Sequence, residues 1–187
     1  PAYFIPAAND PYLHGLSQFV IARAFADSMQ FAAANHQVQI ALPLPLLALE
    51  DMQFMDRMME HLPEKVRQIG FLVTVDCVDL VNDLALVRRI ASELASRNIG
   101  ITINDVDSKG ASLAGRRDLP VVEMKVDRKF IRGCADDRIK QAHCAEIVAI
   151  ARDTGAKSVA EGVETQSVYD ELVALGCDEV QDRKSVV

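Results

Sequence analysis

The sequence predicts an α/β fold in which parallel strands alternate with helices. Apolar residues change along the chain from the three-to-four-residue spacing of helices to the short apolar runs of strands. Strands that alternate with helices pair in parallel through right-handed crossovers. The chain has 187 residues, 50% of them hydrophobic and 25% charged, so it can bury the core of one globular domain.

The elements of the first part of the chain follow from apolar spacing. A helix is predicted over residues 11–33, and its core-facing stripe comprises Leu13, Leu16, Val20 and Ala24. A strand is predicted over residues 37–42. A second helix is expected to end before Pro63. Its stripe indicates a packed face rather than a cofactor site and comprises Met52, Met55, Met59 and Leu62.

The same alternation continues to the end of the chain. Strands are predicted over residues 70–75, 99–105, 121–127 and 158–161. The first of these is followed by a helix that ends near Asn98 and Gly100, with a stripe of Leu80, Leu84, Val87, Ala91 and Leu94. Further helices are predicted over residues 137–153 and 166–175, the last with Thr165 as its N-cap and Gly176 at its end.

The predicted strand at 121–127 has two different faces and so helps to choose the architecture. Side chains alternate along a strand, which groups Val122, Met124 and Val126 on one face and Glu123, Lys125 and Asp127 on the other. A doubly wound sheet is covered on both faces and favours apolar strands. A (β/α) barrel accepts charges that point inward toward a site, and an exposed edge strand is the remaining alternative.

Composition excludes several functional classes. A formal net charge of −7 provides no general attraction to nucleic acid or to an anionic membrane. No apolar run reaches the roughly 18 residues of a membrane span, and Pro1 does not open a signal peptide, so a cytoplasmic location is expected. Free thiols are predicted rather than a disulfide framework or zinc site, because these residues lack the required spacing: Cys77, Cys134, Cys144 and Cys177.

Three motifs in the same order resemble the EAL domains, a family of cyclic-di-GMP phosphodiesterases and their inactive relatives. The segment 157–181 contains Ala-Glu-Gly-Val-Glu-Thr and then Leu-Gly-Cys-Asp before Val-Gln, which matches the family almost letter for letter. Residues 119–131 are similar to the family's Leu-Pro-Val-Asp-x-Leu-Lys-Ile-Asp-Arg-Ser-Phe-Val. Residues 100–113 match a further strand and loop in part, and Phe4-Ile-Pro resembles the residues after the family's first strand.

The resemblance implies an incomplete (β/α) TIM-like barrel of the EAL type. The family's first strand, which carries Glu-Ala-Leu, is expected to be missing, and the last strand is expected to be truncated. Residues 1–181 are therefore predicted to be a partial EAL-like domain. Residues 182–187 read Asp-Arg-Lys-Ser-Val-Val and leave the family pattern, so we expect them to be a non-native tail derived from a sequencing-library adapter.

The resemblance also implies a set of site residues at the strand ends. In the family, acidic and amide side chains there hold magnesium or manganese, and a lysine helps to organise the attacking water. If this chain is active, the implied catalytic residues are Lys125, Glu161 and Glu164, and the implied metal ligands are Asp105 and Glu161. The implied residues for binding the dinucleotide are Asp105, Lys125, Asp127, Glu161 and Gln181.

Three positions depart from the family's ligand pattern. Pro43 stands where the family has a metal-binding Asn, Val75 where it has a metal-binding Glu, and Asn104 where it has the first Asp of a pair. Asp76 follows Val75, and alternation is expected to direct it to the opposite face. The loop at residues 106–110 also departs from the family's Phe-Gly-Thr-Gly-Tyr.

These departures predict a degenerate EAL domain in cyclic-di-GMP signalling. We expect a catalytically inactive dinucleotide receptor or a protein-interaction module, because metal affinity depends on the charge and number of the ligands. The alternative is an active magnesium- or manganese-dependent phosphodiesterase that yields the linear dinucleotide pGpG. An upstream signalling domain or a protein partner is expected, and the sequence leaves the oligomeric state open.

Overall fold

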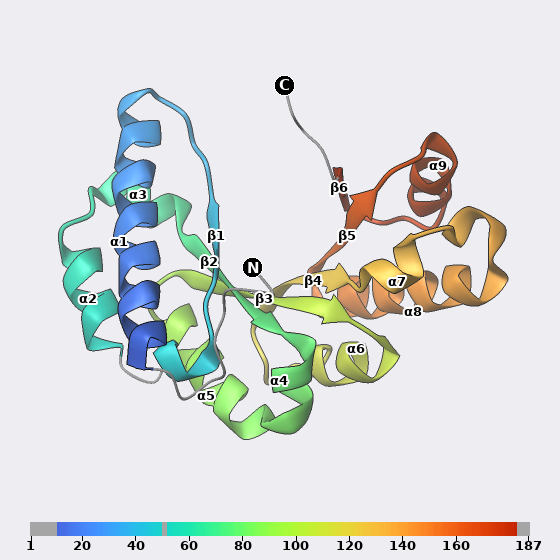
Figure 1. Cartoon of the computed structure of the whole chain (residues 1–187), viewed down its shortest axis with the longest axis horizontal. Helices are drawn as coiled ribbons and strands as arrows, with labels where there is room; N and C mark the ends of the chain where they lie inside the picture. The colour runs from blue at the N-terminus through green and yellow to red at the C-terminus, as the bar shows by residue number, and fades with distance from the viewer. Residues whose placement is uncertain (1–10, 50–51, 183–187) are drawn as a thin grey trace.

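The six strands in the described part of the chain form one curled, fully parallel sheet. The computed structural model describes residues 11–49 and 52–182. Neighbours in the sheet follow the order of the chain: β1 (Ile40–Pro43), β2 (Phe71–Asp76), β3 (Ile99–Val106), β4 (Val121–Val126), β5 (Lys157–Val163) and β6 (Glu179–Asp182). The sheet is an incomplete barrel with β1 and β6 at its two edges (Figure 1). The predicted fold class is confirmed.

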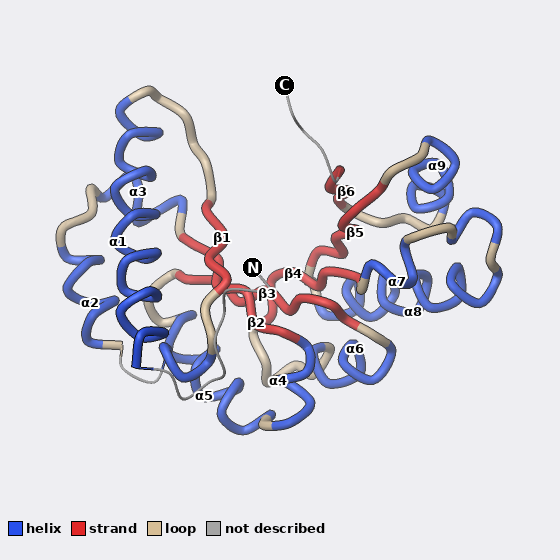
Figure 2. Tube along the Cα trace, in the orientation of Figure 1, coloured by secondary structure: helices blue, strands red, loops and turns tan. Residues whose placement is uncertain are grey.

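Helices cover the outer side of the curled sheet, while the strands line its concave side (Figure 2). They are α1 (Pro11–Ala33), η1 (Leu46–Leu49), α2 (Gln53–Glu60), α3 (Glu64–Ile69), α4 (Cys77–Asn82), α5 (Leu84–Ala95), α6 (Ser108–Ala114), α7 (Arg128–Ile131), η2 (Cys134–Asp136), α8 (Arg138–Thr154) and α9 (Gln166–Ala174). One core cluster joins the helices to the outer face of the sheet. No helix within the described ranges is long and apolar enough to cross a membrane.

The buried face of α1 differs from the predicted stripe. Leu16 is 46% exposed and Val20 is only partly buried, whereas Ile21 and Phe25 are 3% and 1% exposed. Phe25 packs against Phe71 of β2 with ring centroids 4.5 Å apart, and this contact rotates the buried face by one residue. Ala24 is buried as predicted, and the side chain of Leu13 lies outside the described set.

Several short helices were absent from the sequence prediction, and capping aspartates explain some of them. The helix predicted after β2 is divided into α4 and α5, because Asp83 interrupts it and accepts a hydrogen bond from the Leu86 amide at 2.9 Å. Asp107 and Asp127 begin α6 and α7 in the same way. Such side-chain caps satisfy amide groups that a helix leaves unpaired, so even short helices can form behind them.

Strand β4 has the predicted apolar face, with one exception. Met124 and Val126 are buried against the helices. Val122 does not share their face, because the β3–β4 register shifts between Ile101 and Thr102 and turns it toward the concave side. There it lies over Gly100, where an added Cβ would come within 2.7 Å of a Val122 methyl carbon. A larger residue at position 100 would therefore force neighbouring side chains to shift.

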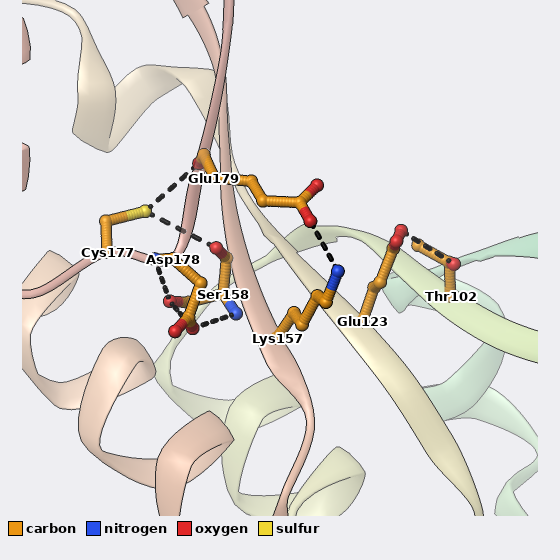
Figure 3. A network of polar contacts seen from close by, with 7 residues as sticks. All are labelled: Thr102, Glu123, Lys157, Ser158, Cys177, Asp178 and Glu179. Carbon is orange, nitrogen blue, oxygen red and sulfur yellow. Dashed lines mark hydrogen bonds and ion pairs between the residues drawn. The ribbon is translucent and has the colours of Figure 1, made fainter.

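Cys177 and Asp178, which lie between α9 and β6, connect β6 to β5 through hydrogen bonds (Figure 3). Asp178 Oδ2 accepts hydrogen bonds from the amide and the hydroxyl of Ser158 at 2.8 and 2.7 Å, and the Asp178 amide donates to the same hydroxyl at 3.1 Å. Ser158 is fully buried. These donors hold the pKa of Asp178 below its usual range. Cys177 adds thiol contacts to the carbonyls of Ser158 and Glu179.

Of the remaining sequence predictions, some are confirmed by the structure and one lies largely outside the described residues. Thr165 caps α9 by accepting from the Val168 amide, and all four cysteines are free, as expected. The methionine stripe belongs to the core, with Met52 and Met55 buried. Asp182 is the last residue of β6 and pairs with Val163. Residues 183–187 and Phe4 lie outside the described ranges, so the predicted non-native tail stays a prediction.

We predict that Asp178→Ala destabilises the fold by about 1–3 kcal/mol, because it leaves the buried donors of Ser158 without an acceptor. Urea denaturation followed by circular dichroism measures this loss. Glu179→Gln is the matched control. It removes an exposed ion pair with Lys157, and such pairs are worth at most about 1 kcal/mol.

The same variant has a defined pH dependence. Asp178 stabilises the fold above its unfolded pKa of about 3.9, and this contribution is lost as pH falls through its lower folded pKa. The difference between wild type and Asp178→Ala should therefore shrink on acidification. Equal stability of the two proteins at neutral pH would contradict this account of β6.

Candidate functional site

The candidate site lies where the carboxyl ends of the parallel strands meet. Strand pairing places Asp76 of β2 opposite Asn104 of β3, and Glu161 of β5 opposite Gln181 of β6. The amide of Asp127, directly after β4, donates to the carbonyl of Val106 at 3.0 Å. Polar residues from five neighbouring strands therefore converge on one edge of the sheet, which is where barrel enzymes carry their sites.

An ion pair across β4 and β5 joins two of the predicted site residues. Lys125 Nζ lies 2.6 Å from Glu161 Oε1, and the two side chains are 15% and 33% exposed. Both residues lie on the concave face because they alternate with buried neighbours, Met124 and Val126 on β4 and Ala160 on β5. At this distance and degree of burial the pair is a charge-assisted hydrogen bond, which fixes both side chains.

Asp105 occupies a strained position in a disrupted part of the β3–β4 ladder. Its φ is +52°, in the left-handed region that side chains seldom adopt, and the register with β4 shifts between Ile103 and Val106. Partial desolvation raises the pKa of Asp105, and repulsion from Asp127, Asp76 and Glu161 raises it further. A strained backbone and a perturbed carboxyl group at one residue are typical of functional sites.

Strand β2 presents Asp76, not Val75, to this site. Val75 is 1% exposed and belongs to the core, whereas Asp76 is exposed and lies within reach of Asn104, whose Nδ2 donates to Asp76 Oδ1 at 3.4 Å. The two side chains alternate as predicted, but Val75 faces the helices and Asp76 faces the site, which is the opposite of the predicted assignment. The sequence analysis therefore missed a carboxylate of the site. The cue available in the sequence was the single polar residue at the end of an apolar strand.

A pocket of about 470 Å³ opens beside these strand ends. Its acidic lining comprises Asp76, Asp105, Asp107 and Asp127. Two lysines, Lys109 and Lys129, also line it, and Lys129 Nζ forms an ion pair with Asp127. The wall on the β2–α4 side is formed by Cys77, Val78 and Val81. The pocket therefore combines carboxylates with cations of the chain's own.

The second glutamate of the Ala-Glu-Gly-Val-Glu-Thr motif has a different partner. Glu164 Oε1 lies 2.8 Å from a guanidinium nitrogen of Arg128. Arg128 in turn covers Gly162, where an added Cβ would lie 3.0 Å from Arg128 Nε. Gly162 has a φ of +78°, so both its conformation and this close approach favour glycine. Glu164 thus anchors the loop after β5.

The oxygen donors at the strand ends do not form a ready metal site. Pro43 lies at the exposed end of β1 and offers no side-chain donor. In the part of the chain that the structure describes, no three carboxylate, histidine or cysteine side chains converge as metal ligands. Glu161 is held by Lys125, and Asp127 by Lys129. Two of the acidic side chains at the strand ends are therefore already paired with lysines in this structure.

Sequence comparisons match this chain to EAL domains and to proteins named for cyclic di-GMP turnover. A family model described as "EAL domain" matches residues 1–181. The chain is 27% identical over 187 residues to the cyclic di-GMP phosphodiesterase PA2567 of Pseudomonas aeruginosa, covering 97% of this chain and 31% of that protein. It is 39% identical over 99 residues to the bifunctional diguanylate cyclase/cyclic di-GMP phosphodiesterase MucR of the same organism, covering 53% and 14%. It thus spans less than a third of either relative.

Solved structures share the fold. The MucR phosphodiesterase in complex with c-di-GMP is 26% identical with a TM-score of 0.75, covering 97% of this chain and 75% of that one. The manganese and cyclic-di-GMP complex of Klebsiella pneumoniae BlrP1 is 24% identical with a TM-score of 0.76, covering 95% and 45%. The curled parallel sheet, the motifs at its strand ends and the family match agree, and the chain belongs to the EAL domain family.

Proposed function

We propose that this chain is a degenerate EAL domain that binds cyclic-di-GMP as a receptor without hydrolysing it. The observation that carries the proposal is the Lys125–Glu161 ion pair at the strand ends. It keeps two residues of the family's site in place, but it also pairs the carboxylate of Glu161 with a lysine instead of a metal ion. The structural relatives that carry cyclic-di-GMP in their names support the choice of ligand.

The loss of catalysis follows from the donor set. Metal-assisted hydrolysis of a phosphodiester uses divalent ions to activate water and to neutralise charge on phosphorus, and such ions prefer anionic oxygen ligands. Here Pro43 supplies no side-chain donor and Asn104 supplies a neutral amide. Two of the carboxylates that remain, Glu161 and Asp127, already have lysine partners. These features oppose the alternative of an active magnesium or manganese phosphodiesterase.

Retention of a ligand site is supported by Asp105. Its left-handed backbone and its raised pKa both cost stability. A module that contacts partners only through its outer surface has no use for such a residue inside a pocket. Together with the cationic groups of Lys125 and Lys129 nearby, Asp105 favours a receptor over a pure interaction module.

The receptor would transmit its signal to other parts of a longer protein or to a protein partner. The curated relatives are more than three times as long as the matched segment, which supports an attached signalling domain. We also propose a cytoplasmic location, where the four free thiols of the chain stay reduced.

Asp105→Asn is predicted to stabilise the fold at neutral pH, because it removes a carboxylate whose ionisation is penalised and keeps a residue type that tolerates the left-handed region. Because the pKa of Asp105 is raised in the folded state, its ionisation destabilises the fold fully above that folded pKa. The destabilisation is absent below the unfolded pKa of about 3.9. The stability gain should thus vanish on acidification. Thermal melts from pH 3 to 8 test this, and a loss of stability at pH 7 would contradict it.

The purified chain is predicted to bind cyclic-di-GMP in calorimetry and to release no pGpG with either magnesium or manganese. Lys125→Ala should weaken binding by about tenfold, the size of one lost charge-assisted contact, while Lys65→Ala, far along the chain on α3, should not. Turnover near 1 per second or faster would establish the enzyme instead. Absence of both binding and turnover would favour the interaction module.

Restoring Asn at position 43 and Asp at position 104 is predicted to strengthen Mn²⁺ binding, since each change adds an oxygen donor or a negative charge to the mouth. The core position of Val75 rules out a matching change there, because a carboxylate would be buried among apolar side chains. Electron paramagnetic resonance of free Mn²⁺ gives the affinity. An unchanged affinity would show that these two positions are not ligand positions.

A further inference from the structure

The pocket at the strand ends contains a cation that belongs to the chain itself. Lys129 lies in α7, directly after the strand that carries Lys125. It engages both oxygens of one carboxylate, because its amide donates to Asp127 Oδ1 at 2.9 Å and its Nζ lies 2.5 Å from Asp127 Oδ2. Asp127 thereby serves as the cap of α7 and as the partner of a lysine at the same time.

The influence of Lys129 extends beyond its direct partner. Its hydrogen bond with Asp127 raises the pKa of Lys129, and attraction to Asp107 and Asp105 adds to that effect. Conversely, Lys129 opposes the repulsion that raises the pKa of Asp105. Lys129 therefore interacts favourably with three of the carboxylates that line the pocket.

This arrangement reduces the negative charge that a metal ion would neutralise, although aspartates still outnumber lysines in the pocket lining. Glu161 is paired with Lys125, and Asp127 is paired with Lys129. The family motif quoted above has serine where this chain has Lys129, so the lysine is a departure from the pattern. Its ammonium group is also supported by the ring of Phe130, whose centroid lies 4.8 Å away.

We propose that Lys129 is a tethered counter-ion that takes the electrostatic place of a divalent cation and keeps such cations out of the pocket. The inference rests on the proposed loss of catalysis and assigns a cause to it beyond the missing ligands. Removing the Lys129 side chain eliminates repulsion between its charge and an incoming divalent ion, and it frees Oδ2 of Asp127 to bind that ion, while Oδ1 still accepts from the main-chain amide of residue 129.

The test is Mn²⁺ binding to the whole chain, measured by electron paramagnetic resonance without any nucleotide. Lys129→Ser should bind Mn²⁺ about tenfold more tightly than wild type, the effect of one unit charge about 6 Å from a divalent ion in a water-like dielectric. Lys129→Arg keeps the charge and should behave as wild type. Lys65→Ser removes the same charge elsewhere, next to Asn35, and should change affinity less than twofold.

Each outcome decides the proposal. Tighter binding in Lys129→Ser alone supports the tethered counter-ion. Equal affinity in wild type and Lys129→Ser overturns it, as does an equal gain in Lys65→Ser, which would indicate a general charge effect. Circular dichroism checks that Lys129→Ser folds, which we expect because the side chain is 59% exposed. Since no nucleotide is present, the result is independent of whether the chain binds cyclic-di-GMP.

Discussion

The parallel pairing of the strands is the constraint on which the candidate site depends. All strand pairs are parallel, so the carboxyl ends of β2 to β6 point to the same edge of the sheet. Residues more than thirty positions apart, such as Lys125 and Glu161, meet there at 2.6 Å. This ion pair joins two neighbouring strands. In the receptor that we propose, the same two residues also contact the ligand.

The candidate site lowers the stability of the fold, and nearby cationic side chains offset part of the repulsion between its carboxylates. Asp105 combines a left-handed backbone with an ionisation that its surroundings oppose. Lys125, Arg128 and Lys129 each neutralise one acidic residue at the same end of the sheet. Paired carboxylates need no metal to be tolerated in a concave pocket. In the receptor that we propose, this pairing lets the domain keep its acidic residues at the strand ends without a metal.

Much of the fold could be predicted because periodicity and parallel connection are local properties of the sequence. The strands at 71–76 and 121–126 lie close to their predicted bounds for this reason. The rotated face of α1 could not be predicted, because a contact between Phe25 and Phe71 outweighs the pattern of aliphatic residues. The short helices α6 and α7 depend on single aspartate caps, and the displaced Val122 depends on a register shift that only strand pairing reveals.

The site was predicted in part for a related reason. Motif resemblance located Lys125, Glu161, Asp105 and Asp127, which the sheet brings together. It assigned Val75 and Asp76 to the wrong faces of β2, because the face of a strand is fixed by packing against the helices rather than by alignment. The pairing of Lys129 with Asp127 is likewise a tertiary fact, since it depends on the turn from β4 into α7.

The central claim is that the strand-end pocket binds cyclic-di-GMP without a metal. The most direct measurement is a nuclear magnetic resonance titration of the isotope-labelled chain with cyclic-di-GMP in the presence of a chelator. We predict saturable shifts of the amides of Asp105, Lys125 and Glu161, with the nucleotide recovered intact. Shifts that appear only when Mn²⁺ is added, together with conversion to the linear dinucleotide, would contradict the claim.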